Sequence, residues 1–183
     1  MEKTDKDLYT EFLNGNEESF KEIILRHKNN LIYFIAKYVK NIEIAEDISQ
    51  DVFVYILVNK EKYNFKYELK TYLYMIAKSR AINYIKREKR IINLQEDENF
   101  YKEELNLEDI ILKKQIQEEI RQAIDKMKRE YQIVIYLVDF EKLSYREVSK
   151  IMEKTELQIK SLVHNARKKL KKILEKEGFN NEK

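Results

Sequence analysis

The sequence predicts an all-α protein of two small helical domains joined by an acidic linker, the C-terminal domain being a helix-turn-helix. The 183 residues contain no proline and only two glycines, Gly15 and Gly178, so little in the chain interrupts helices. Apolar residues recur at i, i+3, i+4 and i+7 over long stretches, which is the period of a helix with one buried face. Residues 91–117 hold seven acidic against three basic residues, between two blocks in which Lys and Arg are in excess.

This charge pattern sets the expected domain boundaries. The segment LQEDENFYKEELNLED has weak periodicity and is typical of a linker. We therefore expect a first domain over residues 1–91, a linker over 92–112 and a second domain over 113–178. The net charge of +3 is too small to identify a binding partner by itself.

Composition also excludes several classes of protein. The longest apolar runs, such as residues 133–138, are far too short to cross a bilayer, and the N-terminus MEKTDKDL is charged from its second residue. Cysteine is absent, which excludes disulfides and Cys-ligated zinc. We expect a soluble, cytoplasmic protein without a membrane partner.

Two helices are predicted at the start of the first domain. The first spans about residues 5–14, with Leu8 and Phe12 as apolar contacts. A long stripe at helical spacing then comprises Phe20, Ile23, Ile24, His27, Leu31, Phe34, Ile35 and Tyr38. Because no second metal-binding type of residue accompanies His27, we expect it to be packed rather than to act as a ligand.

A third helix is predicted over about residues 44–58, and it has two faces. Its core face consists of Ala45, Ile48, Val52 and Ile56. Another face carries Asp47, Gln50, Asp51 and Val54 at i, i+3, i+4 and i+7. Periodicity alone fits either a solvated surface or a docking patch for a basic partner helix.

A fourth helix is predicted to begin near Leu69 and to continue beyond Lys86. The residues expected to face the core are Leu69, Leu73, Ile76, Ala77 and Tyr84. Those expected to project outward are Thr71, Tyr74, Met75, Lys78, Ser79, Ile82 and Lys86, and Arg87, Lys89 and Arg90 extend the charge. Aromatic and apolar side chains among cations suit a single-stranded nucleic acid, whose bases stack while its phosphates pair with the cations.

The preceding segment, residues 59–68, is predicted to be a loop with Tyr63, Phe65 and Tyr67 among lysines. For any one of these rings, covering the edge of the core is the simpler explanation. Together with the outward face of the fourth helix they also fit a surface on which bases stack.

Two capping boxes identify the helix-turn-helix. Ser144 with Glu147, and Thr155 with Gln158, each have the S/T-x-x-E/Q spacing that begins a helix. Only a short turn separates the two predicted helices, and a run of cations follows the second one. This arrangement is typical of a motif that reads duplex DNA.

The second helix of this motif also has two faces. Its core face comprises Ile159, Leu162, Val163, Ala166, Leu170, Ile173 and Leu174. The opposite face carries Lys160, Ser161, His164, Asn165 and Lys168, and Arg167, Lys169, Lys171 and Lys172 extend its charge. Such side chains bind base edges and phosphates. A solvated basic face would look the same, but capping boxes at this spacing favour DNA binding.

Three segments, taken in order, resemble the extracytoplasmic-function (ECF) sigma factors, the compact class of the sigma-70 family with only regions two and four. Residues 45–57 resemble the helix that docks on the β′ clamp of RNA polymerase, and residues 69–87 the helix that opens the minus-ten element. Residues 143–170 resemble the region-four helix-turn-helix that reads the minus-thirty-five element. The resemblance covers nearly the whole chain. It implies an alternative sigma factor that directs core polymerase to promoters, melts DNA and initiates transcription.

The resemblance also implies roles for residues. Core polymerase, through its β′ clamp, would bind Asp47, Gln50, Asp51 and Val54, and the β flap would be a second contact. The nontemplate single strand of the minus-ten element would bind Tyr63, Phe65, Tyr67, Tyr74, Lys78, Ser79, Lys86 and Arg87. Duplex DNA at minus thirty-five would bind Lys160, Ser161, His164, Asn165, Arg167 and Lys168. Many members of this class are held by an anti-sigma factor, although no motif here identifies one. Neither a catalytic residue nor a metal or cofactor is expected.

The chain departs from the pattern of this class at several positions. Tyr72 stands where Trp is usual and Ser79 where Asn is frequent, so the base preference of strand opening is expected to differ. Glu153 replaces the usual Gly of the turn, and therefore either adopts a left-handed conformation or forms another turn. Leu162 and Asn165 replace basic residues, so no known minus-thirty-five sequence can be transferred.

Two alternatives remain open from the residues. A stand-alone helix-turn-helix regulator would bind duplex DNA without polymerase, as a symmetric dimer, but the sequence has no obvious heptad seam for dimerisation. A nuclease would need a carboxylate cluster such as Glu46, Asp47 and Asp51, which a solvated helix face explains more simply. No Gly-rich phosphate loop is present.

Overall fold

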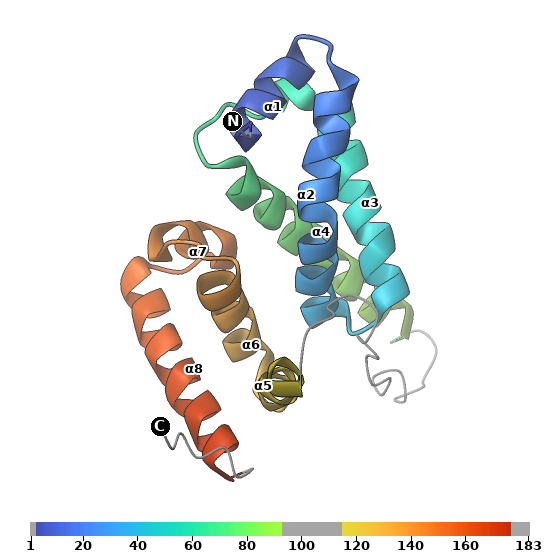
Figure 1. The fold of residues 1–183 in the computed structure, drawn as a ribbon. Coiled ribbons are helices and arrows are strands. Elements are labelled where there is room, and N and C mark those ends of the chain that lie inside the picture. The colour runs from blue at the N-terminus through green and yellow to red at the C-terminus, as the bar shows by residue number, and fades with distance from the viewer. Residues whose placement is uncertain (1–2, 93–114, 177–183) are drawn as a thin grey trace. The chain divides into compact units, whose positions relative to one another are not determined.

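The computed structural model describes residues 3–92 and 115–176, and every regular element within these ranges is a helix (Figure 1). The prediction of an all-α chain is therefore confirmed. The chain divides into two compact units, the first ending at Leu107 and the second beginning at Glu108. Except for residue 92, the predicted linker lies outside the described residues.

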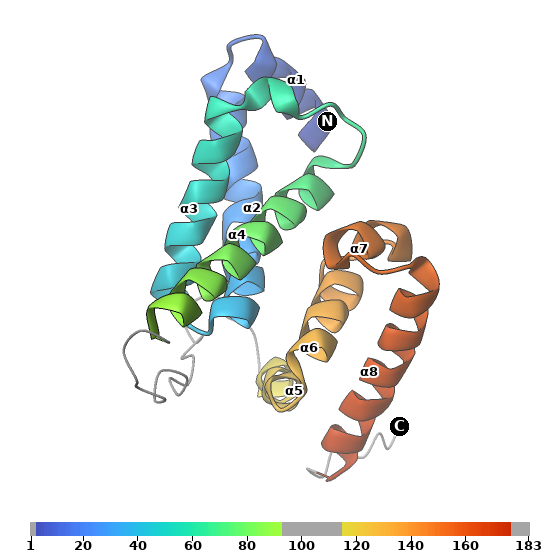
Figure 2. The same ribbon diagram turned by 180° about the vertical axis from the view of Figure 1, so that it is seen from behind.

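Unit one is a bundle in which α2 contacts each of the other long helices. Its elements are α1 (Asp5–Leu13), α2 (Glu17–Val39), α3 (Ile42–Val58), the short 3-10 helix η1 (Lys60–Lys62) and α4 (Leu69–Ile92). In both ribbon views α3 lies along α2, and α4 crosses the pair (Figures 1 and 2). α4 thus contacts α1, α2 and α3.

Capping side chains determine where these helices begin. The hydroxyl of Thr4 accepts the backbone N–H of Asp7, whose carboxylate in turn accepts the N–H of Thr4, which completes a capping box. Asn41 caps α3 by accepting the N–H of Ile44 at 2.9 Å. Lys40 ends α2 in the left-handed conformation, with φ of 54°, so only two residues separate α2 from α3.

The core of unit one follows the predicted stripe of α2. Apart from Ile24, which is half-buried, every member of that stripe is buried. His27 is buried as predicted, and its Nε2 lies 2.6 Å from the Oδ2 of Asp5, at the start of α1. The histidine therefore joins α1 to α2.

Unit two is a second helical bundle, built around the long helix α8. Its elements are α5 (Gln115–Asp125), α6 (Arg129–Ile135), the π-helical turn η2 (Tyr136–Phe140), α7 (Tyr145–Met152) and α8 (Glu156–Lys176). α8 contacts α5, α6 and α7. The predicted core residues Ile159, Val163 and Ala166 are buried, whereas Leu162, Leu170, Ile173 and Leu174 are half-buried.

Both predicted capping boxes are present in the helix-turn-helix. The carboxylate of Glu147 accepts the N–H of Ser144 at 2.8 Å, and the side-chain oxygen of Gln158 accepts the N–H of Thr155 at 2.9 Å. Glu153 adopts the left-handed conformation, with φ of 56°. The N–H of Lys154 then donates to the carbonyl of Ser149 at 3.0 Å, as in a Schellman turn. The turn therefore keeps the geometry usually supplied by Gly, at a cost of about 1 kcal/mol.

Across residues 3–92 and 115–176, no helix combines the length and the apolar character that crossing a lipid bilayer would require.

Candidate functional site

One face of α3 forms an exposed stripe that is acidic at its start and apolar at its end. Asp47, Gln50, Asp51 and Val54 are all exposed, as the helical spacing predicted. The stripe continues one turn further through Leu57 and Val58, which are 49% and 74% exposed. These two residues were not among those predicted for this face, although they continue the same i+3 and i+4 spacing. We call these six residues the α3 stripe.

The α3 stripe borders the cations of α4. An oxygen of Asp51 lies 3.6 Å from a guanidinium nitrogen of Arg80, whose guanidinium also lies 5.2 Å from the ring centre of Tyr55. A groove of about 270 Å³ between the two helices is lined by Ile48, Asp51, Arg80, Asn83, Tyr84 and Arg87. Sequence analysis had not assigned Arg80 and Asn83 a role. Their only sequence signal is the i, i+3 and i+7 spacing that they share with Arg87.

The outward face of α4 differs from the predicted one. Tyr74, Thr71 and Lys78, which were expected to project outward, are buried, and Tyr74 is only 2% exposed. The ring of Tyr74 meets that of Phe34 edge-on, with centroids 4.7 Å apart. Because α4 crosses three helices instead of lying along one, the covered part of its surface is wider than a single apolar stripe. Tyr74 and Lys78 therefore belong to the packed side of α4.

The exposed cations of α4 are concentrated towards its C-terminal half. Ser79, Lys86 and Arg87 are exposed, as expected, and Asn83 joins them. Met75 and Ile82 are half-buried, as are Ile76 and Tyr84, which were expected in the core. The exposed face thus offers hydroxyl, amide and cationic groups and carries few of the predicted apolar side chains.

Within the 59–68 loop, the three aromatic residues have different environments. Tyr63 is buried, its ring stacks on that of Tyr72 with centroids 5.1 Å apart, and its hydroxyl donates to the carbonyl of Tyr67 at 2.7 Å. Burial raises the pKa of Tyr63 to about 12, so the hydroxyl remains a donor. Tyr63 was predicted to bind the nontemplate strand, but its ring lies beneath the loop and covers the edge of the core instead of facing solvent. Tyr67 is half-buried.

Phe65 is the exposed aromatic of this loop, and its backbone is strained. It is 38% exposed and has φ of 58°, a left-handed conformation that bulky side chains rarely adopt. The side chain of Asn64 accepts the N–H of Lys66 at 3.1 Å, which closes the turn around it. Such strain costs about 1–3 kcal/mol and is typical of functional sites. The loop thus presents one ring to solvent on a turn held by its neighbours.

The exposed face of α8 in unit two matches the predicted one. Lys160, Ser161, His164, Asn165 and Lys168 are all exposed. A groove of about 540 Å³ is lined by Tyr145, Lys160, Val163, His164, Arg167, Lys168 and Lys171. Four of these seven residues are Lys or Arg, so the groove offers several donors to an anionic ligand.

Arg167, the remaining predicted residue, is held by a carboxylate. Its guanidinium makes two hydrogen bonds to Asp139 of η2, one of them between Nε and Oδ2 at 3.3 Å. These hydrogen bonds raise the pKa of Arg167. Sequence analysis did not identify Asp139, since the π-helical turn that carries it lies 28 residues before Arg167 and has no local motif.

Within residues 3–92 and 115–176, no three His, Cys, Asp or Glu side chains lie close enough together to hold a metal ion. The carboxylates of Glu46, Asp47 and Asp51, considered above as a nuclease cluster, therefore do not form such a group.

Comparison with known proteins identifies both units. The sigma-70 region 2 family matches residues 23–91, and the sigma-70 region 4 family matches residues 117–170, so the two matches cover about two thirds of the chain. RNA polymerase sigma factor YlaC of Bacillus subtilis strain 168 is 24% identical over 164 residues, which cover 88% of this chain and 95% of that protein.

Two further relatives have similar coverage. ECF RNA polymerase sigma factor SigW of Bacillus subtilis strain 168 is 24% identical and covers 95% of this chain, with 98% of its own length matched. ECF RNA polymerase sigma-E factor of Escherichia coli strain K12 is 24% identical, with 90% of this chain and 91% of that protein covered.

A solved structure has the same fold. The sigma factor RpoE, in its complex with the anti-sigma factor NepR from Bartonella quintana, superposes with a TM-score of 0.68 at 22% identity, covering 86% of this chain and 98% of that one. The two region matches lie in sequence order, one in each unit, and the relatives are matched over nearly their whole length. The chain therefore belongs to the sigma-70 family of RNA polymerase sigma factors, within its extracytoplasmic-function class.

Proposed function

We propose that this chain is an alternative sigma factor that binds core RNA polymerase and directs promoter recognition, DNA melting and transcription initiation. The observation that carries the proposal is the order of the matches: region 2 on unit one and region 4 on unit two. Polymerase supplies the catalysis, and this chain recognises the promoter and opens its strands. Such a protein works in the cytoplasm, beside the chromosome.

The α3 stripe is the proposed polymerase-binding surface. Its acidic start, at Asp47 and Asp51, suits a basic partner helix, and its apolar end, at Val54, Leu57 and Val58, supplies surface that gains free energy when buried. Exposed apolar side chains adjacent to charged ones are typical of protein interfaces. This combination favours a docking face over a plain solvated one.

Unit one is also proposed to hold the nontemplate strand at minus ten. Phe65 offers an exposed ring, while Lys86 and Arg87 of α4 offer cations for phosphates. Unstacking costs a few kcal/mol per base step, and stacking on an aromatic side chain returns roughly 1–3 kcal/mol per base. Strand opening is therefore nearly balanced, and small changes in ring position alter it measurably.

Unit two is proposed to bind duplex DNA at minus thirty-five through the groove along α8. Lys160 and Lys168, which line the groove, would bind phosphates, and His164 in the groove, with the exposed Ser161 and Asn165, would contact base edges. Neither unit needs to bind DNA tightly alone, because core polymerase would hold both at the spacing of the promoter. An anti-sigma factor is a further proposed partner, since the relative from Bartonella quintana is bound to one.

Run-off transcription tests the proposal. Core polymerase is incubated with genomic fragments, with and without the purified chain, and transcripts are mapped. New transcripts that require the chain are expected. The stand-alone regulator predicts the opposite: tight binding to a specific duplex without polymerase, by a symmetric dimer, and no new transcript start.

A further inference from the structure

We propose that Tyr9 of α1 is a positioning residue for strand opening: it fixes the 59–68 loop and, through Phe65, helps to set which base is preferred. This inference rests on the proposed function of unit one. α1 lies outside residues 23–91, the part of the chain that the region 2 family matches. The role proposed for Tyr9 is therefore argued from the contacts that Tyr9 makes in this structure and not from the family match.

Tyr9 contacts the loop in two ways. Its hydroxyl donates to the carbonyl of Lys60, at a distance of 2.9 Å, across 51 residues of sequence. Its ring lies edge-on to Tyr63 and Phe65, with centroids 4.7 Å and 6.0 Å away. Tyr9 is completely buried, and burial raises the pKa of its hydroxyl, so this group remains a hydrogen-bond donor. One side chain of α1 thus holds both the start of the loop and its exposed ring.

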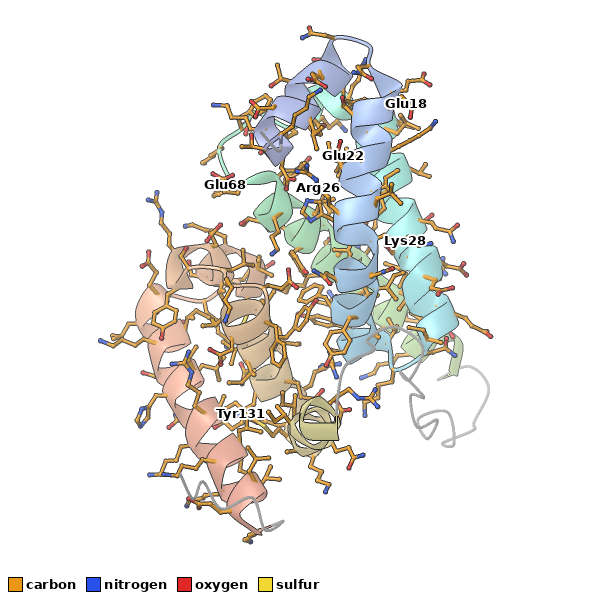
Figure 3. The ribbon with its side chains drawn as sticks, in the orientation of Figure 1. Glu18, Glu22, Arg26, Lys28, Glu68 and Tyr131 are labelled. Atoms are coloured by element: carbon orange, nitrogen blue, oxygen red, sulfur yellow. The ribbon has the colours of Figure 1, made fainter. Side chains whose placement is uncertain are left out.

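α1 is itself fixed on α2, which gives Tyr9 a defined position. Asp5 meets the Nε2 of His27 at 2.6 Å and a guanidinium nitrogen of Arg26 at 3.3 Å. Arg26 projects from α2 (Figure 3). The same guanidinium donates to the carbonyl of Lys3 at 2.7 Å. The rings of Phe12 and Phe20 stack, with centroids 4.4 Å apart, which joins the other end of α1 to α2.

The strain at Phe65 explains why such support is needed. A bulky residue keeps a left-handed backbone only where its surroundings impose it. The hydrogen bonds that hold this loop include those from Tyr9 to Lys60, from Tyr63 to Tyr67, and from Lys66 to Asn64. Tyr9 supplies the first of these and also contacts the Phe65 ring. Without it the loop loses its hydrogen bond to α1 and the edge-on contact with the Phe65 ring, and that ring can then move to less strained positions.

The test uses the full chain bound to core polymerase and a promoter fragment that the wild-type chain opens. Tyr9→Phe keeps the ring and removes only the hydroxyl. Opening is followed by permanganate reactivity of thymines, and base preference by binding of nontemplate-strand oligonucleotides that carry each of the four bases in turn at every opened position. We expect Tyr9→Phe to lower opening by roughly three- to tenfold and to flatten the base preference, because one hydrogen bond to the loop is lost.

Tyr38→Phe is the matched control. Tyr38 is a buried tyrosine of α2, a different helix from that of Tyr9, and its ring lies edge-on to Phe34 with centroids 5.3 Å apart. Thermal unfolding measures the stability of both variants. If Tyr38→Phe reproduces the loss at a similar change in unfolding temperature, Tyr9 acts through stability alone, and the proposal is overturned.

A double-mutant cycle with Phe65→Leu tests whether Tyr9 acts through the ring. We expect Tyr9→Phe to have little additional effect on base preference once Phe65 has been replaced. The proposal is overturned if the effects of the two substitutions on base preference are additive, or if Tyr9→Phe alone leaves the base preference unchanged. In either case the wild-type chain still opens the promoter, so the proposed function stands. If the wild-type chain does not join polymerase or open any fragment, the failure belongs to the proposed function.

Discussion

The two units present nucleic acid with two different kinds of surface. In unit one, an aromatic ring projects from a strained loop that hydrogen bonds from two buried tyrosines help to hold in place. In unit two, long cationic side chains project from an exposed helix face, along an open groove. Stacking on a flipped base needs a ring at a defined position, whereas phosphates of a regular duplex can be reached by flexible cations. The difference suggests that the two proposed tasks place different demands on rigidity.

The largest expected effect is on polymerase binding through the α3 stripe of unit one. Replacing both Asp47 and Asp51 with Lys reverses the charge of the α3 stripe towards a basic partner. We expect the affinity for core polymerase to fall by about 3 kcal/mol, roughly a hundredfold, because like charges then face each other. Binding of the full chain to duplex DNA should not weaken. Unchanged polymerase binding would show that the docking face lies elsewhere.

Phe65→Ala tests whether the ring on the loop of unit one binds an unstacked base. Loss of the ring should reduce strand opening by about 1–3 kcal/mol, the range measured for stacking of one base. Because Phe65 is partly exposed, unfolding stability should change by less than about 1 kcal/mol. Permanganate reactivity and thermal unfolding report these two quantities. A large loss of stability with normal opening would reverse the assignment and make the ring a core residue.

In unit two, changing the charge along α8 should alter how strongly duplex binding depends on salt. Lys160→Ala is expected to reduce duplex affinity similarly for all sequences and to lower the slope of log K against log salt by about one unit. Asp139→Asn is the complementary variant: it removes the charge that holds Arg167, so the slope should become steeper. Titrations with duplex DNA at several salt concentrations give this slope for both variants. No change in slope for either variant would mean that this groove does not face phosphates.

The smallest effect concerns the support of α1 and has a defined pH dependence. Burial opposes ionisation of Asp5, but hydrogen bonds and charge from His27 and Arg26 outweigh it and lower the pKa of this carboxyl. Since the folded-state pKa lies below the unfolded value, this stabilisation is present at neutral pH and is lost as the pH falls below about 4.

Asp5→Asn should therefore lower the unfolding temperature at pH 7 and reduce its further decline between pH 5 and pH 3. Thermal unfolding across that range is the measurement. If the unfolding temperature falls equally with acid in the wild type and the variant, Asp5 does not contribute to the pH dependence of stability.

Local rules predicted unit two better than unit one. The capping boxes at Ser144 and Thr155, and the exposed face of α8, follow from spacings of three or four residues, and the structure has them as expected. Tyr74 and Lys78 were misplaced because the crossing of α4 over three helices is a tertiary feature. A periodic pattern identifies the centre of a buried face, but the width of that face depends on how many neighbours cover it.

Partners distant in sequence were missed for the same reason. Asp139 and Arg167 are 28 residues apart, and Tyr9 and Lys60 are 51 apart, and neither pair has a spacing that a sequence motif could reveal. The burial of Tyr63 depends on Tyr9 and Tyr72, which come from two other helices. The sequence of the loop therefore shows that it is aromatic but not which of its rings is exposed.

The two-residue junction between α2 and α3 bears on how the chain folds as it is synthesised. With only Lys40 and Asn41 between them, these helices meet almost as soon as both exist, and closing so short a connection costs little entropy. Contacts between sequence neighbours favour fast folding, and N-terminal domains generally fold first on the ribosome. The surface proposed to hold polymerase should then be complete while the DNA-reading helix is still being translated.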